Sequence, residues 1–251
     1  ALQCGTSHNL GQGFAKSFQI SFRGKDEKEH TPWQTSWGFS TRLIGALAMV
    51  HGDDKGLVLP PKVAENKIVI VPIIFEDTKE KVMKKSLEIK KKLADFSPIF
   101  DDRDYSPGWK FSEWEMKGIP LRIEIGPEDI EKGKVTIVRR DNGMKEQVAE
   151  KSIVKRIGEI LDGMQKNLFE KAKKFLDGRI DSAKSMKELK EKLAQRKVVK
   201  VYMSNQREIE DAIKEETGGA ASIIIEISKK EGICIKSGKK TKTLAYFAKS
   251  Y

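Results

Sequence analysis

The sequence predicts a multidomain protein of mixed α/β and α+β class, and three observations lead to this prediction. The 251 residues are enough for two domains and part of a third, each with an ordinary hydrophobic core. From Ile68 onward, apolar strand-like runs alternate with segments of helical period, which is typical of α/β domains. Pro60 and Pro61 interrupt the chain and mark a boundary. The expected domains are residues 1–62, 63–150 and 151–251.

The first domain is expected to end in a helix whose N-terminus carries an arginine. Before it, the charged residues 23–30 form a solvated hairpin turn. Ser40, Thr41 and Arg42 stand at the helix start, where unpaired N–H groups and partial positive charge attract phosphate. A guanidinium can hold a phosphate or stack on a base, so this element suits a nucleoside triphosphate. Gly52 ends the helix, and its apolar positions recur at helical spacing: Leu43, Ile44, Leu47, Ala48 and Val50.

The second domain opens with a nearly continuous apolar run, residues 68–74, as expected for a strand covered on both faces. Thr78 begins a helix that reaches about Asp95. The exposed side of this helix is either a solvated surface, the usual role of such charge runs, or an RNA contact. Against Glu80 and Glu88 it carries seven lysines, namely Lys79, Lys81, Lys84, Lys85, Lys90, Lys91 and Lys92.

A second helix and a strand follow in the same domain. Ser106 and Pro107 suit the N-cap and the first helical position, and Gly118 suits the residue after the helix. In residues 119–125 apolar and polar side chains alternate, which predicts a half-buried strand with Arg122 on its other face.

The rest of the chain continues the alternation of strands and helices. A strand at 135–138 ends in Arg139-Arg140 and the turn 141–143, so the sheet is expected to be mostly parallel or mixed. Residues 150–176 keep a helical period, in one long helix or in two that meet near Gly163. A third α/β unit has expected helices at 186–195 and 208–217 and expected strands at 198–203, 222–227, 233–236 and 244–247.

Charge and hydropathy narrow the class of partner. Lys and Arg number 48 against 37 Asp and Glu, and the resulting net charge of +11 favours a polyanionic partner, with RNA ahead of a membrane. No apolar run is long enough for a membrane-spanning helix and no secretory signal is visible, so a cytoplasmic location is expected. Cys4 and Cys234 match no metal-site spacing and are expected to be reduced thiols rather than a disulfide.

Four segments, in matching order, carry a resemblance to a known family. Residues 33–61, WQTSWGFSTRLIGALAMVHGDDKGLVLPP, resemble the third signature motif of class II aminoacyl-tRNA synthetases, in the form found in prolyl-tRNA synthetases of the archaeal/eukaryotic type. Residues 1–22 resemble the strand and TSH loop that precede this motif, and residues 101–126 and 248–251 continue the similarity. The resemblance implies the end of an antiparallel-sheet catalytic domain, an α/β anticodon-binding domain and a small α/β C-terminal domain.

The resemblance also implies a ligase reaction, in which ATP activates proline to prolyl-adenylate and the prolyl group passes to tRNA(Pro). Such phosphoryl transfer depends mainly on positioning and positive charge. Carried over residue by residue, Arg42 is the catalytic residue and pairs with the phosphates and adenine of ATP. By the same carry-over, Gln3 contacts ATP and its Mg²⁺, Thr6 and Ser40 bond ATP, and His8, Trp37 and Gly38 line the proline pocket.

Each of these roles has a structural alternative. Arg42 could be an ordinary surface arginine of a helix, and His8 a structural histidine outside its TSH context. Trp37 could serve packing alone. His30 and His51 receive no role.

The second domain is expected to read the two guanines of the proline anticodon. A carboxylate can accept from the N1–H and N2–H edge of guanine, while Arg or Lys can donate to O6 and N7. Glu115, Arg122 and Lys145 occupy the positions implied by the resemblance. The alternative for Glu115 and Arg122 is an ion pair within the domain, and Arg139 and Arg140 could hold the phosphate backbone or have no RNA role.

The C-terminal unit departs from the family pattern. Many relatives bind a structural zinc there through four cysteines, whereas the corresponding positions here are Asp177, Ser182, Cys234 and Lys236, so no zinc site is expected. The terminal Tyr251 either organises the active site or the tRNA end, or is simply a docked terminus.

The chain begins with Ala1, and the first and second class II motifs are not found in it, so it is expected to be the C-terminal portion of a longer enzyme. The parent is expected to be a homodimer, and no editing domain is visible in this portion. Two other hypotheses stay open: a tRNA-binding module without catalysis as it stands, and a generic basic protein that binds RNA or DNA. Proline-dependent pyrophosphate exchange and tRNA competition distinguish them.

Overall fold

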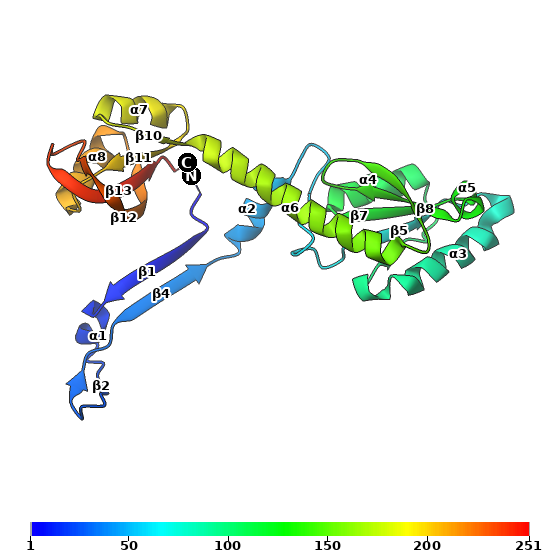
Figure 1. The fold of residues 1–251 in the computed structure, drawn as a ribbon, viewed down its shortest axis with the longest axis horizontal. Helices are drawn as coiled ribbons and strands as arrows, with labels where there is room; N and C mark the ends of the chain where they lie inside the picture. Colours follow the sequence, from blue (N-terminus) through cyan, green and yellow to red (C-terminus); the bar gives the residue numbers. More distant parts are fainter. Residues whose placement is uncertain (1, 251) are drawn as a thin grey trace. The chain divides into compact units, whose positions relative to one another are not determined.

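The computed structural model describes residues 2–250, which form two compact units. The middle unit is Leu47–Lys174, and the terminal unit comprises the residues up to Ala46 together with those from Phe175. Helices α2 (Arg42–His51) and α6 (Ile153–Arg179) run from one unit into the other (Figure 1). The expected domain boundaries at residues 62 and 150 rest on sequence motifs and stay predictions.

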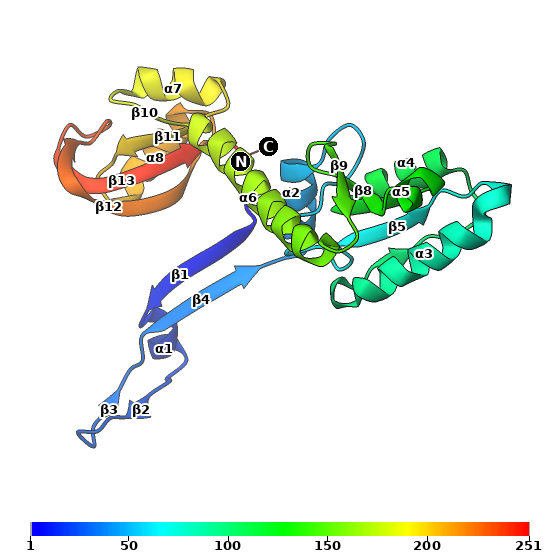
Figure 2. The same ribbon diagram turned by 45° about the vertical axis from the view of Figure 1, so that its right-hand side comes forward.

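A five-stranded mixed sheet forms the centre of the middle unit (Figure 2). The first three strands in spatial order are parallel, and the last two run antiparallel to their neighbours. The mixed sheet expected from the sequence is therefore confirmed. The spatial order is β6 (Ile99–Phe100), β5 (Ile68–Pro72), β7 (Leu121–Ile125), β8 (Lys134–Arg139) and β9 (Lys145–Ala149).

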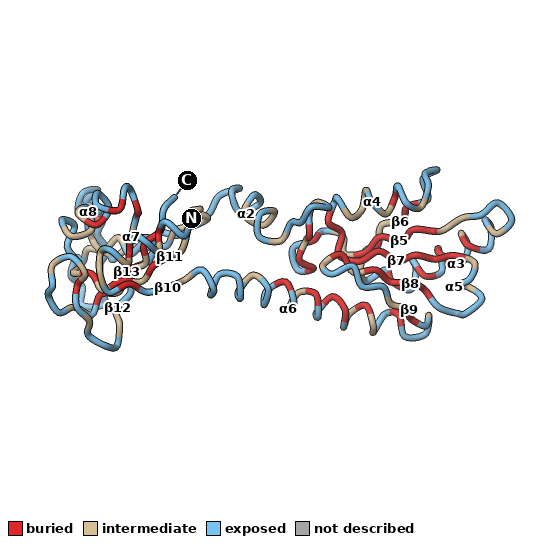
Figure 3. The backbone as a smooth tube through the Cα atoms, turned by 90° about the horizontal axis from the view of Figure 1, so that it is seen from above, coloured by how far each residue is buried: buried red, intermediate tan, exposed pale blue. Residues whose placement is uncertain are grey.

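Helices cover both faces of this sheet, which explains why the central strands are buried along their whole length (Figure 3). One face packs against α3 (Lys79–Lys92) and the first half of α6, in a core that includes Ile70 and Ile123. The other face packs against α4 (Pro107–Lys117), whose Phe111 and Trp114 lie on Val69 and Val71. The short helix α5 spans Pro127–Glu131, and 3₁₀ turns span Glu76–Thr78 and Ala94–Phe96.

The half-buried strand expected at 119–125 is a wrong prediction. All five residues of β7 are buried, because α4 covers the face that the sequence pattern assigned to solvent. Two charged residues of that face, Arg122 and Glu124, pair with each other. The other open question is also decided, since α6 continues through Gly163 without a break.

The N-terminal part of the terminal unit is an antiparallel pair, β1 (Gly5–Gly11) with β4 (Gln34–Phe39). Thr6, Ser7 and His8 lie in the strand β1 and not in the loop that the resemblance implies. Three short elements connect the two strands, and the expected hairpin turn lies between the last two of them. They are α1 (Gly13–Ser17), which was not expected, β2 (Phe22–Arg23) and β3 (Glu29–His30).

The C-terminal part of the terminal unit has a four-stranded sheet in the order β10-β11-β13-β12. Its core gathers Leu189, Leu193, Val199, Ile213 and Phe247 from strands and helices. The elements are β10 (Ile180–Ser182), α7 (Met186–Ala194), β11 (Val198–Tyr202), α8 (Arg207–Glu216), β12 (Ala221–Ile233) and β13 (Lys240–Ala248).

Two expectations for this sheet are wrong. The separate strands predicted at 222–227 and 233–236 are one strand, β12, which continues to Ile233 across an irregular register near Gly232. Residues after Ile233 turn back toward β13, with the Gly238 N–H donating to the Cys234 carbonyl. The strand β10 was not predicted at all, because its three residues carry no periodic pattern.

Within residues 2–250, no helix is long and apolar enough to cross a membrane. Tyr251, for which two roles were considered, lies outside the described residues.

Candidate functional site

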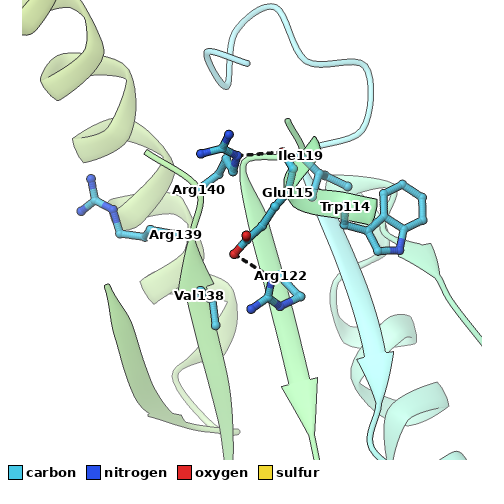
Figure 4. A pocket seen from close by; sticks show the side chains of 7 residues that line it. All are labelled: Trp114, Glu115, Ile119, Arg122, Val138, Arg139 and Arg140. Carbon is cyan, nitrogen blue, oxygen red and sulfur yellow. Dashed lines mark hydrogen bonds and ion pairs between the residues drawn. The ribbon is translucent and has the colours of Figure 1, made fainter. Parts of the chain in front are cut away.

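A small hollow in the middle unit lies where the C-terminal end of α4 meets strands β7 and β8 (Figure 4). Two of the residues expected to contact the anticodon, Glu115 and Arg122, point toward each other across it. Seven residues line the hollow, namely Trp114, Glu115, Ile119, Arg122, Val138, Arg139 and Arg140.

Local sequence signals place Glu115 at this hollow. The Ser106 side chain caps α4 by accepting from the Trp109 N–H, and Pro107 follows at the first helical position. Gly118 ends the helix in the left-handed conformation, with a φ of 76°, as a glycine C-cap does. The expected start and end of this helix are confirmed, and Glu115 falls in its last turn.

Arg122 is a buried charge of the site. Its Nε and Nη2 donate to the Glu124 Oε1 at 3.0 and 2.8 Å, and both side chains are 7% exposed. Its guanidinium carbon also lies 4.1 Å from the centre of the Phe111 ring. These contacts leave Nη1 toward the hollow, 3.5 Å from the Glu115 carboxylate.

The Glu115 carboxylate lies between two cations, both too far away to use up its capacity to accept hydrogen bonds. One carboxylate oxygen is 3.5 Å from Arg122 and the other is 3.5 Å from Lys55. Such distances are long for hydrogen bonds, so both oxygens can still accept from an incoming N–H group. The Glu115 side chain is 29% exposed and therefore reachable from solvent.

Arg139 and Arg140 are both held by carboxylates of the same unit. Arg140 donates to Asp53 through two nitrogens at 2.7 and 2.6 Å, and its Nε donates to the Glu115 carbonyl at 2.8 Å. The hydrogen bonds from Arg140 lower the pKa of Asp53 to about 2. Arg139 pairs with Asp141 at 2.8 Å. Both arginines therefore have structural partners, and Arg140 fixes the end of α4 through the Glu115 carbonyl.

Glu124 is the residue of this site that sequence analysis missed. One carboxylate oxygen of Glu124 accepts from Arg122, and the other lies 3.6 Å from the Lys145 ammonium. It thus joins Arg122 and Lys145, two of the residues expected to contact RNA, in one network with Glu115. The signal was available in the sequence, since Glu124 follows Arg122 by two positions and shares its face of the strand.

A second group of expected site residues lies in the terminal unit. Gln3, Thr6 and His8 line an open cleft, whose opposite wall is formed by residues 221–225 of β12 with Ala248 and Ser250. None of the described lining residues is acidic. A magnesium ion there would therefore have to arrive with the phosphates of a nucleotide, because hard cations take oxygen ligands, chiefly carboxylates and phosphates.

The start of α2 is tied to the same part of the cleft. The Arg42 Nη1 donates to the Gln3 carbonyl at 2.9 Å, and the Arg42 N–H donates to the Ser40 hydroxyl at 3.4 Å. Gly38 pairs with Thr6 across the two strands. The structure thus brings Gln3, Thr6, Ser40, Gly38 and Arg42 into one neighbourhood.

Trp37 is not brought to this neighbourhood. It pairs with Ser7, whereas His8 pairs with Ser36. Since successive residues of a strand point to opposite faces, Trp37 lies on the other face of the strand pair from Thr6 and His8. Its side chain is 82% exposed.

Comparison with known proteins identifies both parts of the chain. Residues 67–160 match the family model described as "Anticodon binding domain", and residues 186–251 match "Prolyl-tRNA synthetase, C-terminal". The proline–tRNA ligase of Lachnoclostridium phytofermentans is 47% identical over 254 residues, which cover 100% of this chain and 53% of that protein. The chain belongs to the prolyl-tRNA synthetase family. Proline–tRNA ligases of Oceanobacillus iheyensis and Natranaerobius thermophilus are 46% and 43% identical over the whole chain and over 52% and 53% of their own lengths.

The prolyl-tRNA synthetase chain described here spans about half the length of the curated relatives it matches. The hollow with Glu115 and Arg122 falls inside the matched anticodon-binding domain. The relatives' names do not separate the archaeal/eukaryotic type from others, so that assignment stays a prediction.

Two of the four positions that the resemblance aligned with zinc-binding cysteines have other contacts in the structure. Lys236 pairs with Glu216, and the buried Cys234 sulfur accepts from the Ser237 N–H at 3.3 Å. Burial raises the pKa of the Cys234 thiol, but hydrogen bonds from Ser237, Ser204 and Lys236 outweigh this effect and bring the pKa to about 7. Across residues 2–250, no group of three or more His, Cys, Asp or Glu side chains could hold a metal ion.

Proposed function

We propose that this chain is the anticodon-reading and C-terminal portion of a proline–tRNA ligase, and that it also contributes part of the site for ATP and proline. The whole enzyme activates proline with ATP and transfers it to tRNA(Pro). The observation that carries the proposal is the Glu115–Arg122 pair, which lies at the hollow of a domain matched by the anticodon-binding model.

The geometry suits a guanine edge. Glu115 offers two carboxylate oxygens with only long contacts to cations, which can accept from the guanine N1–H and N2–H. Arg122 keeps Nη1 toward the hollow, and the 60% exposed Lys145 can turn from Glu124 to a guanine O6 or N7. The ion pair that was the alternative for Glu115 and Arg122 exists, and at 3.5 Å it is loose enough for a base to replace it.

The proposed roles in the terminal unit depend on residues from two strands and a helix. Arg42 would hold the ATP phosphates and adenine, with Thr6 and Ser40 as further hydrogen-bond partners and Gln3 close to the nucleotide-bound Mg²⁺. His8 and Gly38 would line the proline pocket. Trp37 lies on the other face of the strand pair from His8 and could line the same pocket only if its strand were turned. Its assignment to the proline pocket therefore has the least support.

Two wider proposals concern the whole protein. We propose that it is a homodimer in the cytoplasm, as class II synthetases of this kind imply. Phe18 and Phe39 are 70% and 81% exposed, and large exposed apolar side chains are typical of surfaces that further protein covers. This exposure supports an interface with the rest of the enzyme or with a second subunit. Sedimentation of the whole protein tests the dimer.

Binding of a hairpin RNA with the proline anticodon loop tests the proposal. Glu115→Gln and Arg122→Gln are each expected to weaken binding and to reduce the preference for guanine over adenine at the second or third anticodon position. The loss of one good base contact corresponds to about 5- to 150-fold. Glu146→Gln, which removes a carboxylate paired with Arg156 outside the hollow, should leave the preference intact. The proposal would be refuted if the wild-type chain bound the hairpin with guanine and the hairpin with adenine at that anticodon position equally well.

The alternative function, a tRNA-binding module without catalysis as it stands, is separated by a second assay. Proline-dependent exchange of pyrophosphate into ATP, measured on this chain, reports adenylate formation. Guanine-dependent RNA binding without exchange supports the module, whereas exchange supports a working adenylate site.

A further inference from the structure

Two aromatic rings beside the N-terminus of α4 are stacked on each other and open to solvent. The Tyr105 and Trp109 ring centres are 4.1 Å apart, with an angle of 25° between the planes. Their exposed fractions, 53% and 45%, are large for aromatic side chains in a well-packed unit. Neither ring belongs to the hydrophobic clusters that α4 forms with the sheet. Core packing therefore does not account for them.

The stacked pair is held in place by an ion-paired arginine. The Arg103 guanidinium lies 5.6 Å from the Tyr105 ring centre and 5.4 Å from that of Trp109. Two carboxylates fix this guanidinium: Asp101, which accepts at 2.8 Å from two of its nitrogens, and Glu113, which accepts at 2.5 Å. The rings thus form a rigid surface, which loses little conformational freedom when a ligand binds.

Helix α4 carries the exposed ring of Trp109 and part of the anticodon hollow. Arg103 also lies 5.9 Å from the ring centre of Trp114, which lines that hollow. Trp114 is locked by its indole N–H, which donates to Asp101 at 2.7 Å. Trp109 lies in the first turn of α4, and Glu115 of the hollow lies in its last turn, six residues further and about 9 Å along the helix axis.

The local charge selects a base over a phosphate. The four charges joined in one ion-pair cluster with Arg103, namely Asp101, Arg103, Glu113 and Lys117, sum to zero, and Arg103 is flanked in the sequence by Asp102 and Asp104. Such a surface does not attract the RNA backbone. A flat ring pair does suit a nucleobase, because unpaired bases of RNA stack on aromatic side chains.

We propose that Tyr105 and Trp109 form a stacking site for one unpaired base of the RNA loop whose other bases enter the hollow of Glu115 and Arg122. This stacking site rests on the proposed anticodon function, since the short distance along α4 from Trp109 to the hollow favours RNA over a protein partner. It adds affinity without reading the base, because every base has a flat face.

The test uses the full chain and a hairpin RNA with the proline anticodon loop. Trp109→Ala is expected to weaken binding by about 5- to 150-fold, the range for loss of one base–aromatic stack. Trp109→Phe, which keeps a ring, should lose much less. Phe169→Ala removes another exposed aromatic of the middle unit and should have no effect. The slope of log affinity against log salt should not change in Trp109→Ala, because no phosphate contact is lost.

Abasic substitutions along the RNA loop identify the stacked base. At one position, removal of the base should weaken binding by wild-type chain to the level of Trp109→Ala, and the two changes together should cost no more than either alone. Tyr105→Ala, with folding checked by circular dichroism, gives a second and independent variant. If both alanine variants bind as wild type does, or if no abasic position cancels the effect of Trp109→Ala, the stacking site is refuted.

The outcomes also separate this inference from the proposed function. Wild-type binding that prefers guanine, together with unchanged binding by both alanine variants, would leave the anticodon function standing and overturn the stacking site alone. Wild-type binding without guanine preference would overturn the anticodon function itself.

Discussion

Glu124→Gln should destabilise the middle unit strongly, although the substitution changes almost no volume. Glu124 accepts two hydrogen bonds from Arg122 at 3.0 and 2.8 Å, and both side chains are 7% exposed. Removing one partner of a buried ion pair costs about 3–5 kcal/mol, because the other charge stays buried without compensation. Glu115 remains 3.5 Å from Arg122, and the glutamine oxygen still accepts, so we expect a loss near the lower end, about 3 kcal/mol.

A matched double variant tests the physical reason. Arg122→Met with Glu124→Leu replaces both charges by apolar side chains of similar size, and it should lie within about 1 kcal/mol of wild type. The same double variant should reduce the preference for guanine about as much as Arg122→Gln does, since Arg122 is gone while Glu115 remains. The double variant would thus keep its stability while its preference for guanine falls.

Urea unfolding followed by tryptophan fluorescence measures both variants. Trp33 and Trp37 are first replaced by phenylalanine, so that the signal comes only from Trp109 and Trp114 in the middle unit. A loss below about 1 kcal/mol in Glu124→Gln, or a double variant as unstable as the single one, would refute the account of a buried pair that must be kept whole.

Three further predictions concern acid, backbone conformation and metal. Hydrogen bonds from an arginine and a tryptophan hold the pKa of Asp101 at about 2, below its ordinary 3.8, despite burial. The resulting stability of about 2 kcal/mol is present above pH 4 and lost as the pH falls toward 2, so acid should narrow the stability difference between wild type and Asp101→Asn. Gly118→Ala should lower the urea midpoint, because φ is 76° and a Cβ would lie 2.6 Å from a leucine side chain, whereas the control Gly158→Ala meets nothing within 4 Å. Zinc or a chelator should leave the melting temperature unchanged, since Cys234 has no thiol or imidazole partners for a tetrahedral site within residues 2–250.

Elements with strong local signals were predicted well from the sequence. The limits of α4 follow from Ser106, Pro107 and Gly118, each of which acts on its own backbone neighbours. The buried strand β5 follows from its apolar run. In contrast, β7 was assigned one solvated face, because alternation records polarity and cannot show that a helix covers the polar side.

The candidate site shows the same division. Glu115, Arg122 and Lys145 were expected at the site from family motifs, and the structure joins all three in one ion-pair network through Glu124, while their contact with RNA stays a prediction. Glu124 was missed although it stands two positions after Arg122, because the sequence pattern assigned this face of β7 to solvent, where a carboxylate needs no partner. The position of Trp37 on the face away from His8 depends on strand register, which a motif does not contain.

The sequence by itself determined the family, the basic character, the mixed class and the helix ends, since these depend on residue types and on contacts a few positions apart. Only the tertiary structure decided which charges are buried together, which rings stay exposed beside the hollow, and which face each strand residue occupies. Those features arise where segments distant in the chain meet, and the cost of burying a charge or the benefit of stacking a ring exists only once they have met.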